Sequence, residues 1–131
     1  MIHETFECSV LTPEEVVFQG DVKRLVIPAH DGQLGILPSH APMVCKLGAG
    51  RLRLHAEQGV QNWFVEGGVV QIADNRVSVL TEFAVRPEQL DREHTLQLLK
   101  DARSMPTHDE QSRLRREHLE ASARAQLHML G

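Results

Sequence analysis

The stretch Asn75–Arg103, NRVSVLTEFAVRPEQLDREHTLQLLKDAR, changes its pattern at Arg86. Upstream of that point, β-branched residues recur in short runs that are separated by glycine-containing turns. Downstream, glycine is absent until Gly131 and β-branched residues are rare. This change predicts a β domain over residues 1–86 and an α-helical domain over residues 87–131.

Toward the N-terminus, the turn signals and apolar runs are typical of short strands. Leu52 and Leu54 alternate with polar residues at period two, as expected for a strand with one buried face. Asp74-Asn75 suits a tight hairpin turn, because both side chains tolerate a positive φ. Gly67-Gly68 lies between two strand runs and indicates a bulge or a close backbone approach. Many short strands at this spacing predict an antiparallel β-sandwich or barrel.

Toward the C-terminus, the sequence predicts two helices that form a hairpin. Pro87 suits the first position of a helix, and Ser104-Met105-Pro106 would end it. Thr107 and Glu110 have the spacing of a capping box that begins a second helix. Both helices have a thin apolar stripe, which predicts either weak docking of the hairpin or a permanently packed appendage. The stripes comprise Thr95, Leu98, Leu99 and Ala102 in the first helix and Leu119, Ala123, Leu127 and Leu130 in the second.

The composition excludes several classes of protein. The chain has 131 residues, 41% of them apolar and 24% charged, which is ordinary for a globular protein. A net charge of -4 gives no basic footprint for nucleic acid. No apolar run approaches the roughly 18 residues of a membrane span, and the N-terminus lacks the pattern of a signal peptide. Cys8 and Cys45 fit a reducing compartment.

No motif in the sequence predicts catalysis, a metal site or a bound cofactor. The eight histidines form neither HExxH nor a paired Cys/His array, and no nucleophile elbow or phosphate-binding loop occurs. Arg113, Arg115 and Arg116 form a small basic cluster in the second predicted helix. Two interpretations of this cluster stay open: a solvated helix face, or a contact with acidic residues of a partner. Binding is therefore the expected activity, with no enzyme chemistry.

Several motifs occur in an order that resembles a known family. Thr12-Pro13-Glu14 and Val17-Phe18-Gln19-Gly20 resemble its opening, and Val65-Glu66-Gly67-Gly68-Val69-Val70 resembles its glycine pair. The most recognisable stretch is Asp31-Gly32-Gln33-Leu34-Gly35-Ile36-Leu37-Pro38-Ser39-His40-Ala41-Pro42. Together these motifs are similar to those of the epsilon subunits of F-type ATP synthase, which are called delta in mitochondria.

The resemblance implies a sandwich of about ten strands followed by a two-helix hairpin. It implies a non-catalytic rotor subunit of the central stalk that binds the gamma subunit and the c-ring and couples ion-driven rotation to ATP synthesis. It also implies transient contacts of the C-terminal helices with the alpha and beta subunits, which inhibit ATP hydrolysis in some members. The protein would reach the cytoplasmic face of the bacterial inner membrane, or an equivalent organelle membrane, only through the complex. The implied contact loop comprises Asp31, Gly32, Gln33, Leu34, Gly35, His40 and Pro42.

Two positions depart from the family pattern. Gln33 stands where an acidic residue is frequent, and His94 replaces the arginine of a nucleotide motif that begins at Leu90-Asp91. The degenerate motif predicts weak or absent nucleotide binding. The alternative from another class is a stand-alone β-sandwich that binds a ligand or acts as an enzyme.

Overall fold

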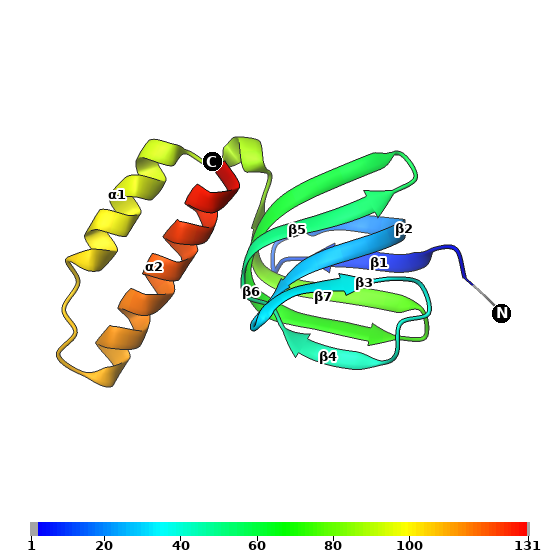
Figure 1. The fold of residues 1–131 in the computed structure, drawn as a ribbon, viewed down its shortest axis with the longest axis horizontal. Helices are drawn as coiled ribbons and strands as arrows, with labels where there is room; N and C mark the ends of the chain where they lie inside the picture. The colour runs from blue at the N-terminus through cyan, green and yellow to red at the C-terminus, as the bar shows by residue number, and fades with distance from the viewer. Residues whose placement is uncertain (1–2, 131) are drawn as a thin grey trace. The chain divides into compact units, whose positions relative to one another are not determined.

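The computed structural model describes residues 3–130 and divides the chain into two compact units, Met1–Val85 and Arg86–Gly131 (Figure 1). The first unit consists of strands and the second of helices, so the predicted β-then-α organisation is confirmed. The β unit contains β1 (Phe6–Leu11), β2 (Val16–Ala29), β3 (Gly32–Ile36), β4 (Met43–Lys46), β5 (Ala49–Ala56), β6 (Gly59–Ala73) and β7 (Arg76–Val85). The helical unit contains the 3₁₀ turn η1 (Pro87–Gln89), α1 (Arg92–Arg103) and α2 (Glu110–Leu130).

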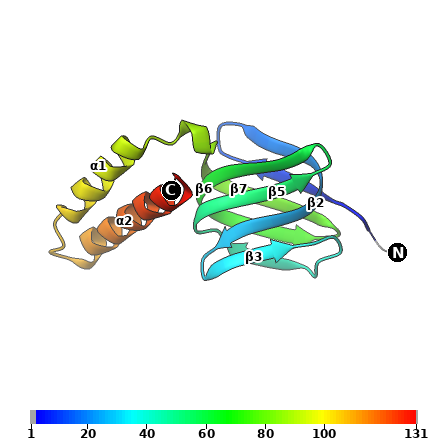
Figure 2. The same cartoon turned by 45° about the horizontal axis from the view of Figure 1, so that its top comes forward.

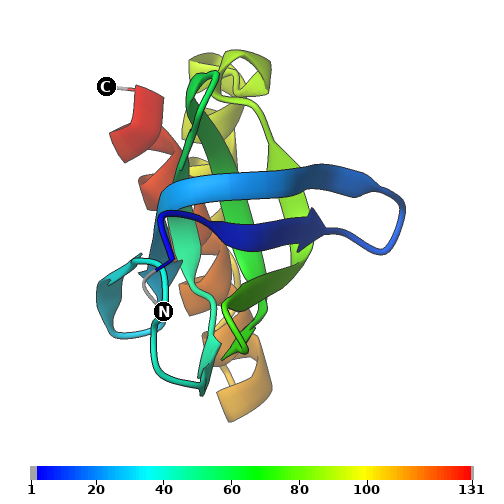
Figure 3. The ribbon, with the colours of Figure 1, turned by 90° about the vertical axis from the view of Figure 1, so that its right-hand side faces the viewer.

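The strands pair around the sandwich in the order β1-β7-β6-β5-β2-β3, with β4 beside β6 and β1 also beside β2. Figure 3 shows β1 running alongside the first half of β2. All pairings are antiparallel except that of β1 with β7, which is parallel. This parallel pair is the one departure from the antiparallel arrangement that the sequence predicts.

Three long strands change layers, which reconciles the seven continuous strands with the expected ten. β2 pairs with β1 up to Val22 and, after an irregularity at that residue, with β5 and β3. β6 pairs with β5 up to Glu66 and with β4 from Val69 onward. β7 pairs with β1 through Leu80 and then continues beside the first half of β6. When β2, β6 and β7 are counted once in each layer, the seven strands make ten.

The change of layer in β6 depends on glycine. Gly67 and Gly68 have φ angles of 70° and 114°, which residues with a side chain rarely adopt. A Cβ atom at Gly68 would collide with the carbonyl oxygen of Leu80 on β7. The hydroxyl of Thr81, which is 3% exposed, donates to the carbonyl of Gly67 at 2.8 Å. The predicted close backbone approach at this glycine pair is therefore confirmed.

The core between the two layers is apolar and tightly closed. Leu52 and Leu54 are completely buried, as the period-two pattern of β5 predicts, and so is Leu25 on β2. Cys8 is also completely buried, and burial raises the pKa of its thiol to about 12. Both cysteines are free thiols. The core comprises Phe6, Cys8, Val10, Val22, Leu25, Ile27, Ile36, Leu47, Leu52, Leu54, Ala56, Trp63, Val65, Val70, Ile72, Val77 and Val79.

The helix starts differ from those predicted. Pro87 begins the short η1 turn, and α1 begins only at Arg92, because Asp91 acts as its N-cap and accepts from the backbone N–H of Glu93 at 2.9 Å. For α2, the cap is Asp109 rather than Thr107. Asp109 Oδ1 accepts from the N–H of Ser112 at 2.7 Å, and the Ser112 hydroxyl accepts from the N–H of Asp109 at 3.2 Å. The reciprocal cap is thus two residues later than predicted.

The interface between α1 and α2 is small and partly polar. Its buried residues in α1 are Thr95, Leu99 and Ala102, whereas Leu98, expected in the same stripe, is 38% exposed. In α2 only Ser122 and Ala123 are buried. The Thr95 hydroxyl lies 2.7 Å from the carbonyl oxygen of Asp91 and 3.2 Å from Oε1 of Gln126 on α2. Leu119, expected in the stripe of α2, is also 38% exposed, and Ala123 is the buried member of that stripe. The apolar stripe is therefore thinner than the sequence predicts, and polar groups complete it.

Candidate functional site

The predicted contact loop forms the β2–β3 hairpin and the segment that follows it. Gly32 has a φ of 135° and ends the turn after Asp31, so the chain can reverse into β3. Along β3, Gln33 and Gly35 are exposed, whereas Leu34 is half-buried against the core. A Cβ at Gly35 would meet no atom within 4 Å, so this face of the strand is open. A glycine here leaves the backbone approachable by a partner.

The segment after β3 is anchored to the β6–β7 turn. Ser39 has a φ of 64°, and its backbone N–H donates to Oδ1 of Asn75 at 2.8 Å. The amide nitrogen of Asn75 donates in turn to the carbonyl of Thr5 at 2.9 Å. Asn75 was predicted only as a turn residue, because a bond between positions 36 residues apart leaves no trace in the sequence. The loop is therefore held in place rather than free.

Exposed apolar residues lie on both sides of this anchored segment in the sequence. Leu37 is 59% exposed, Val44 68% and Met43 37%, and Pro42 between them is exposed as well. We call Leu37, Pro42, Met43 and Val44 the apolar loop surface. His40 lies in the same segment, with Nδ1 of its ring 2.8 Å from the carbonyl oxygen of Ala41. Leu37, Met43 and Val44 were not among the predicted contact residues, although apolar residues directly beside a proline-rich loop are the signal that could have identified them.

Acidic neighbours engage two of the three clustered arginines in α2. Arg116 Nε lies 2.8 Å from Oε1 of Glu120, which also lies 3.4 Å from Arg124. Bonding to Arg116 and the positive charges of Arg116, Arg124 and Arg103 lower the pKa of Glu120. Arg113 faces Glu110 at 4.0 Å, a weak contact. The cluster is thus part of an ion-pair network, and Glu120, which the sequence did not single out, is the centre of that network.

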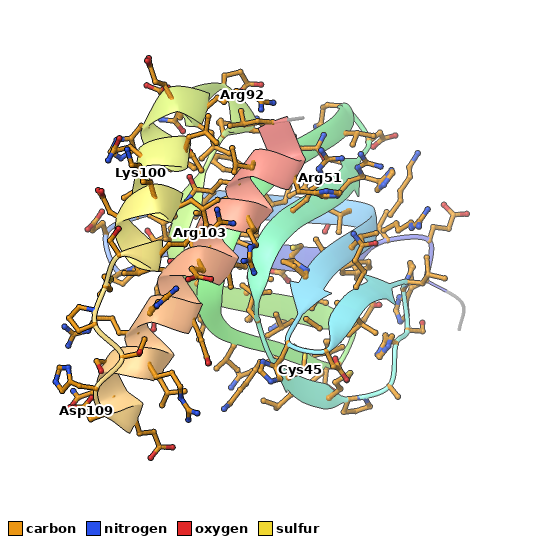
Figure 4. The ribbon with its side chains drawn as sticks, turned by 60° about the vertical axis from the view of Figure 1, so that its left-hand side comes forward. Cys45, Arg51, Arg92, Lys100, Arg103 and Asp109 are labelled. Atoms are coloured by element: carbon orange, nitrogen blue, oxygen red, sulfur yellow. The ribbon has the colours of Figure 1, made fainter. Side chains whose placement is uncertain are left out.

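The residues of the degenerate nucleotide motif have structural roles. Asp91 caps α1, and the backbone N–H of His94 donates to its carboxylate at 3.3 Å. The side chain of His94 is exposed, and Leu90 is half-buried at the end of η1. Figure 4 labels the basic residues Arg92, Lys100 and Arg103 along α1.

The described residues 3–130 include two free cysteines but no metal-binding cluster. No group of three or more His, Cys, Asp or Glu side chains in this part of the chain could hold a metal ion. No helix in the same range is long and apolar enough to cross a membrane. Cys45 is half-buried on β4, and burial together with the charge of Asp31 raises the pKa of its thiol.

The chain thus has a two-layer β-sandwich with an anchored, apolar and exposed loop, followed by an αα-hairpin. Comparison with known proteins gives the family. Residues 5–87 match the family model described as the ATP synthase delta/epsilon chain, β-sandwich domain. The chain belongs to this family.

Named relatives include bacterial ATP synthase epsilon chains. That of Leptospira borgpetersenii is 35% identical over 114 residues, covering 87% of this chain and 90% of the relative. The epsilon chain of Bordetella avium is 36% identical over 93 residues, covering 70% of this chain and 66% of the relative. Among solved structures, a chain of the Euglena gracilis mitochondrial ATP synthase has a TM-score of 0.89 at 24% identity, covering all of this chain and 84% of that one. The last likeness supports the fold, including the two-helix C-terminal unit.

Proposed function

We propose that this chain is a non-catalytic rotor subunit of the central stalk of an F-type ATP synthase. In this role it couples ion-driven rotation of the c-ring to ATP synthesis through the gamma subunit. The single observation that carries the proposal is the apolar loop surface, which is exposed in the isolated chain and anchored by Asn75. An anchored surface loses little entropy on binding, so it suits a permanent protein interface. Membership of the family supplies the partners.

The proposed contact loop comprises the apolar loop surface together with Asp31, Gly32, Gln33, Leu34, Gly35 and His40. We place it against the c-ring and the foot of gamma. The protein would then lie at the cytoplasmic face of the bacterial inner membrane, or at an equivalent organelle membrane, as a peripheral part of the complex. Gly35 supports this placement, because its open face admits close approach of a partner backbone.

The test uses the full chain and purified gamma subunit. Leu37→Asp combined with Val44→Asp should weaken the complex at least about tenfold in size-exclusion or titration experiments, since each places a charge in an apolar interface. Val60→Asp is the control, because Val60 is 54% exposed and lies at the start of β6, where it pairs with His55 of β5 rather than with the loop. Equal binding by the loop variant and the control would refute the proposed contact.

A bulky residue at Gly35 tests coupling in the assembled complex. Gly35→Trp should abolish or strongly reduce ATP-driven ion pumping, while the isolated chain stays folded because no atom lies near the new Cβ. Gly35→Ala is the control at the same position, because it adds only a methyl group in open space. Normal pumping by the Gly35 variant would exclude close approach of a partner at this residue.

We further propose that the α1–α2 hairpin restrains ATP hydrolysis. Because the interface between α1 and α2 is small and partly polar, separating the helices costs little free energy. The folded hairpin and an extended state can therefore lie within a few kcal/mol of each other. In an extended state Arg113, Arg115 and Arg116 would meet acidic residues of the alpha and beta subunits. Because Arg116 is paired with Glu120 in the hairpin, its contribution requires exchange of one acidic partner for another.

Deletion of residues 88–131 in an otherwise intact complex should raise ATP hydrolysis. Changing Arg113, Arg115 and Arg116 together to Ala should reproduce much of the increase. Arg124→Ala is the matched control, because it removes a charge paired with the same Glu120 but outside the cluster. Unchanged hydrolysis after the deletion, with normal assembly, would show that the hairpin does not restrain the enzyme.

Nucleotide binding by the isolated chain should be weaker than about 1 mM, because His94 cannot offer the bidentate donor geometry of arginine. Asp91 is also committed to capping α1. Calorimetry with ATP checks this expectation, and His94→Arg is the variant in which binding should improve. Micromolar binding by the unaltered chain would contradict it.

A further inference from the structure

A basic hollow lies on the outer face of the layer formed by β5, β2 and β3, which Figure 2 shows side by side. Its volume is about 190 Å³. The alternation of β5 that buries Leu52 and Leu54 turns the intervening residues outward. The hollow is lined by Arg24, Val26, Gln33, Arg51, Arg53 and His55.

Strand pairing brings these side chains together from distant parts of the sequence. Arg24 on β2 lies opposite His55 on β5, and Val26 lies opposite Arg53. On its other side Val26 faces Gly35 of β3, which has no side chain. The missing side chain leaves room beside Val26, so the arginines surround an open floor.

The charges of the hollow lack acidic counterparts. No acidic residue lines it, and Arg24 and Arg51 have neither an ion pair nor a hydrogen bond within residues 3–130. Arg53 donates only to the neutral amide of Asn62, at 3.1 Å. Nε2 of His55 is buried and has no hydrogen-bond partner among the described residues. Arg51, labelled in Figure 4, extends from β5. Clustered cations and an unpartnered ring nitrogen favour an anionic ligand.

We propose that this hollow binds a small phosphate-bearing anion. The volume is below the roughly 300 Å³ of a pocket for a drug-sized molecule, so the ligand is about the size of pyrophosphate or a single phosphomonoester group. Arginine suits this chemistry, because its planar fork donates two parallel hydrogen bonds to phosphate oxygens. The four basic side chains of the hollow, from Arg24, Arg51, Arg53 and His55, lie outside the proposed contact loop, whereas Gln33 belongs to both. Anion binding by the isolated chain can therefore be tested separately from the proposed rotor function.

The test titrates the full chain with pyrophosphate while backbone and arginine side-chain NMR signals are followed. Arg24, Arg51, Arg53 and His55 should shift together, with a dissociation constant of about 1 mM or tighter. Arg24→Gln and Arg51→Gln should each weaken binding at least about fivefold, because a charge-assisted bond is lost. Arg76→Gln is the control: it removes a cation of the same unit that is paired with Glu7 at 3.3 Å outside the hollow.

Two further arms identify the source of the phosphate. Vesicles with and without about one third phosphatidic acid test a lipid headgroup: arginine-dependent binding to the acidic vesicles that pyrophosphate displaces would assign the site to lipid. Pyrophosphate binding without vesicle binding would assign it to a free anion. No shift at about 10 mM pyrophosphate, shifts unchanged by the Arg24 and Arg51 variants, or binding of poly-glutamate but not of pyrophosphate would each overturn the proposal.

Discussion

The β unit and the hairpin are stabilised in different ways. The sandwich buries a continuous core in which Leu25, Leu52 and Leu54 have no exposed surface. The hairpin buries three residues of α1 and two of α2, and it also has a hydrogen bond between the helices and ion pairs along α2. Apolar burial contributes about 25 cal/mol per Å², so the sandwich holds most of the folding free energy. A rigid unit suits permanent binding, and a weakly held unit suits a change of state.

The largest change in stability that tests this difference between the units is expected at Gly68. Gly68→Ala places a Cβ against the Leu80 carbonyl at a φ of 114°, so strain and collision act together. We expect a loss of about 3–5 kcal/mol in the free energy of unfolding of the β unit, measured by denaturant titration. Gly35→Ala is the control and should change stability by less than about 1 kcal/mol, because open space surrounds it. Equal losses would mean that the glycine pair does not determine the layer change.

Alkali should weaken the sandwich selectively through Cys8. Burial raises the pKa of this thiol from 9.0 to about 12, so Cys8 ionises less readily in the folded protein than in the unfolded chain. This stabilisation of the folded state is fully present at a pH below the pKa of the thiol in the unfolded chain. It is lost as the pH rises through the pKa of the thiol in the folded chain. Between pH 9 and 12 the β unit should lose about 1 kcal/mol per pH unit, as measured by denaturant unfolding. Cys8→Ala should flatten this pH dependence, although it also costs packing.

The sequence predicted the two-unit organisation because its signals are local. Glycine usage and β-branched content change at Arg86, and period-two alternation identified the buried leucines of β5. The helix starts were misplaced by a few residues. Thr107 has the chemistry of a cap, as do the observed caps Asp91 and Asp109, and only the geometry of the first turn distinguishes among such candidates. Element boundaries depend on single hydrogen bonds, which composition does not encode.

The candidate sites were predicted less completely, because they depend on long-range pairing. The contact loop was found by its motif, yet its anchor at Asn75 and its exposed Leu37, Met43 and Val44 were not. The arginines of β5 were noted only as the polar half of an alternating strand. Arg24 joins them across a β2–β5 register that the sequence does not specify. A surface built from several strands is visible only after the strands are paired.

The polar part of the hairpin interface gives a smaller effect. Thr95→Val removes a hydroxyl that is 1% exposed and bonds to Asp91 and Gln126, while the shape of the side chain is kept. We expect a loss of about 1–2 kcal/mol in the local stability of the hairpin, measured by hydrogen exchange of α1 amides. The amides of β5 should be unaffected. An equal increase in exchange in both units would contradict separate stabilisation.

The smallest effect is expected at Glu120, and it has the opposite pH dependence from Cys8. Bonding to Arg116 and the neighbouring positive charges hold the pKa of Glu120 below its ordinary 4.5, and bonding to Ser112 lowers that of Asp109. Because the pKa of the carboxyl group is lower in the folded state, it stabilises the hairpin at a pH above the pKa of the unfolded chain. The stabilisation is lost as the pH falls through the pKa of the folded state. Hairpin helicity, followed by circular dichroism, should therefore decline below about pH 4.5 before the β unit changes.

Glu120→Gln should reduce this decline and make it less sensitive to salt, because the variant lacks the ion pairs with Arg116 and Arg124 that salt screens. The matched variant Glu117→Gln removes an acid from the same helix that has no assigned ion pair, so it should leave the acid transition unchanged. If the two variants behaved alike, the acid sensitivity would come from net charge, and the ion-pair network would have no specific part in holding the hairpin.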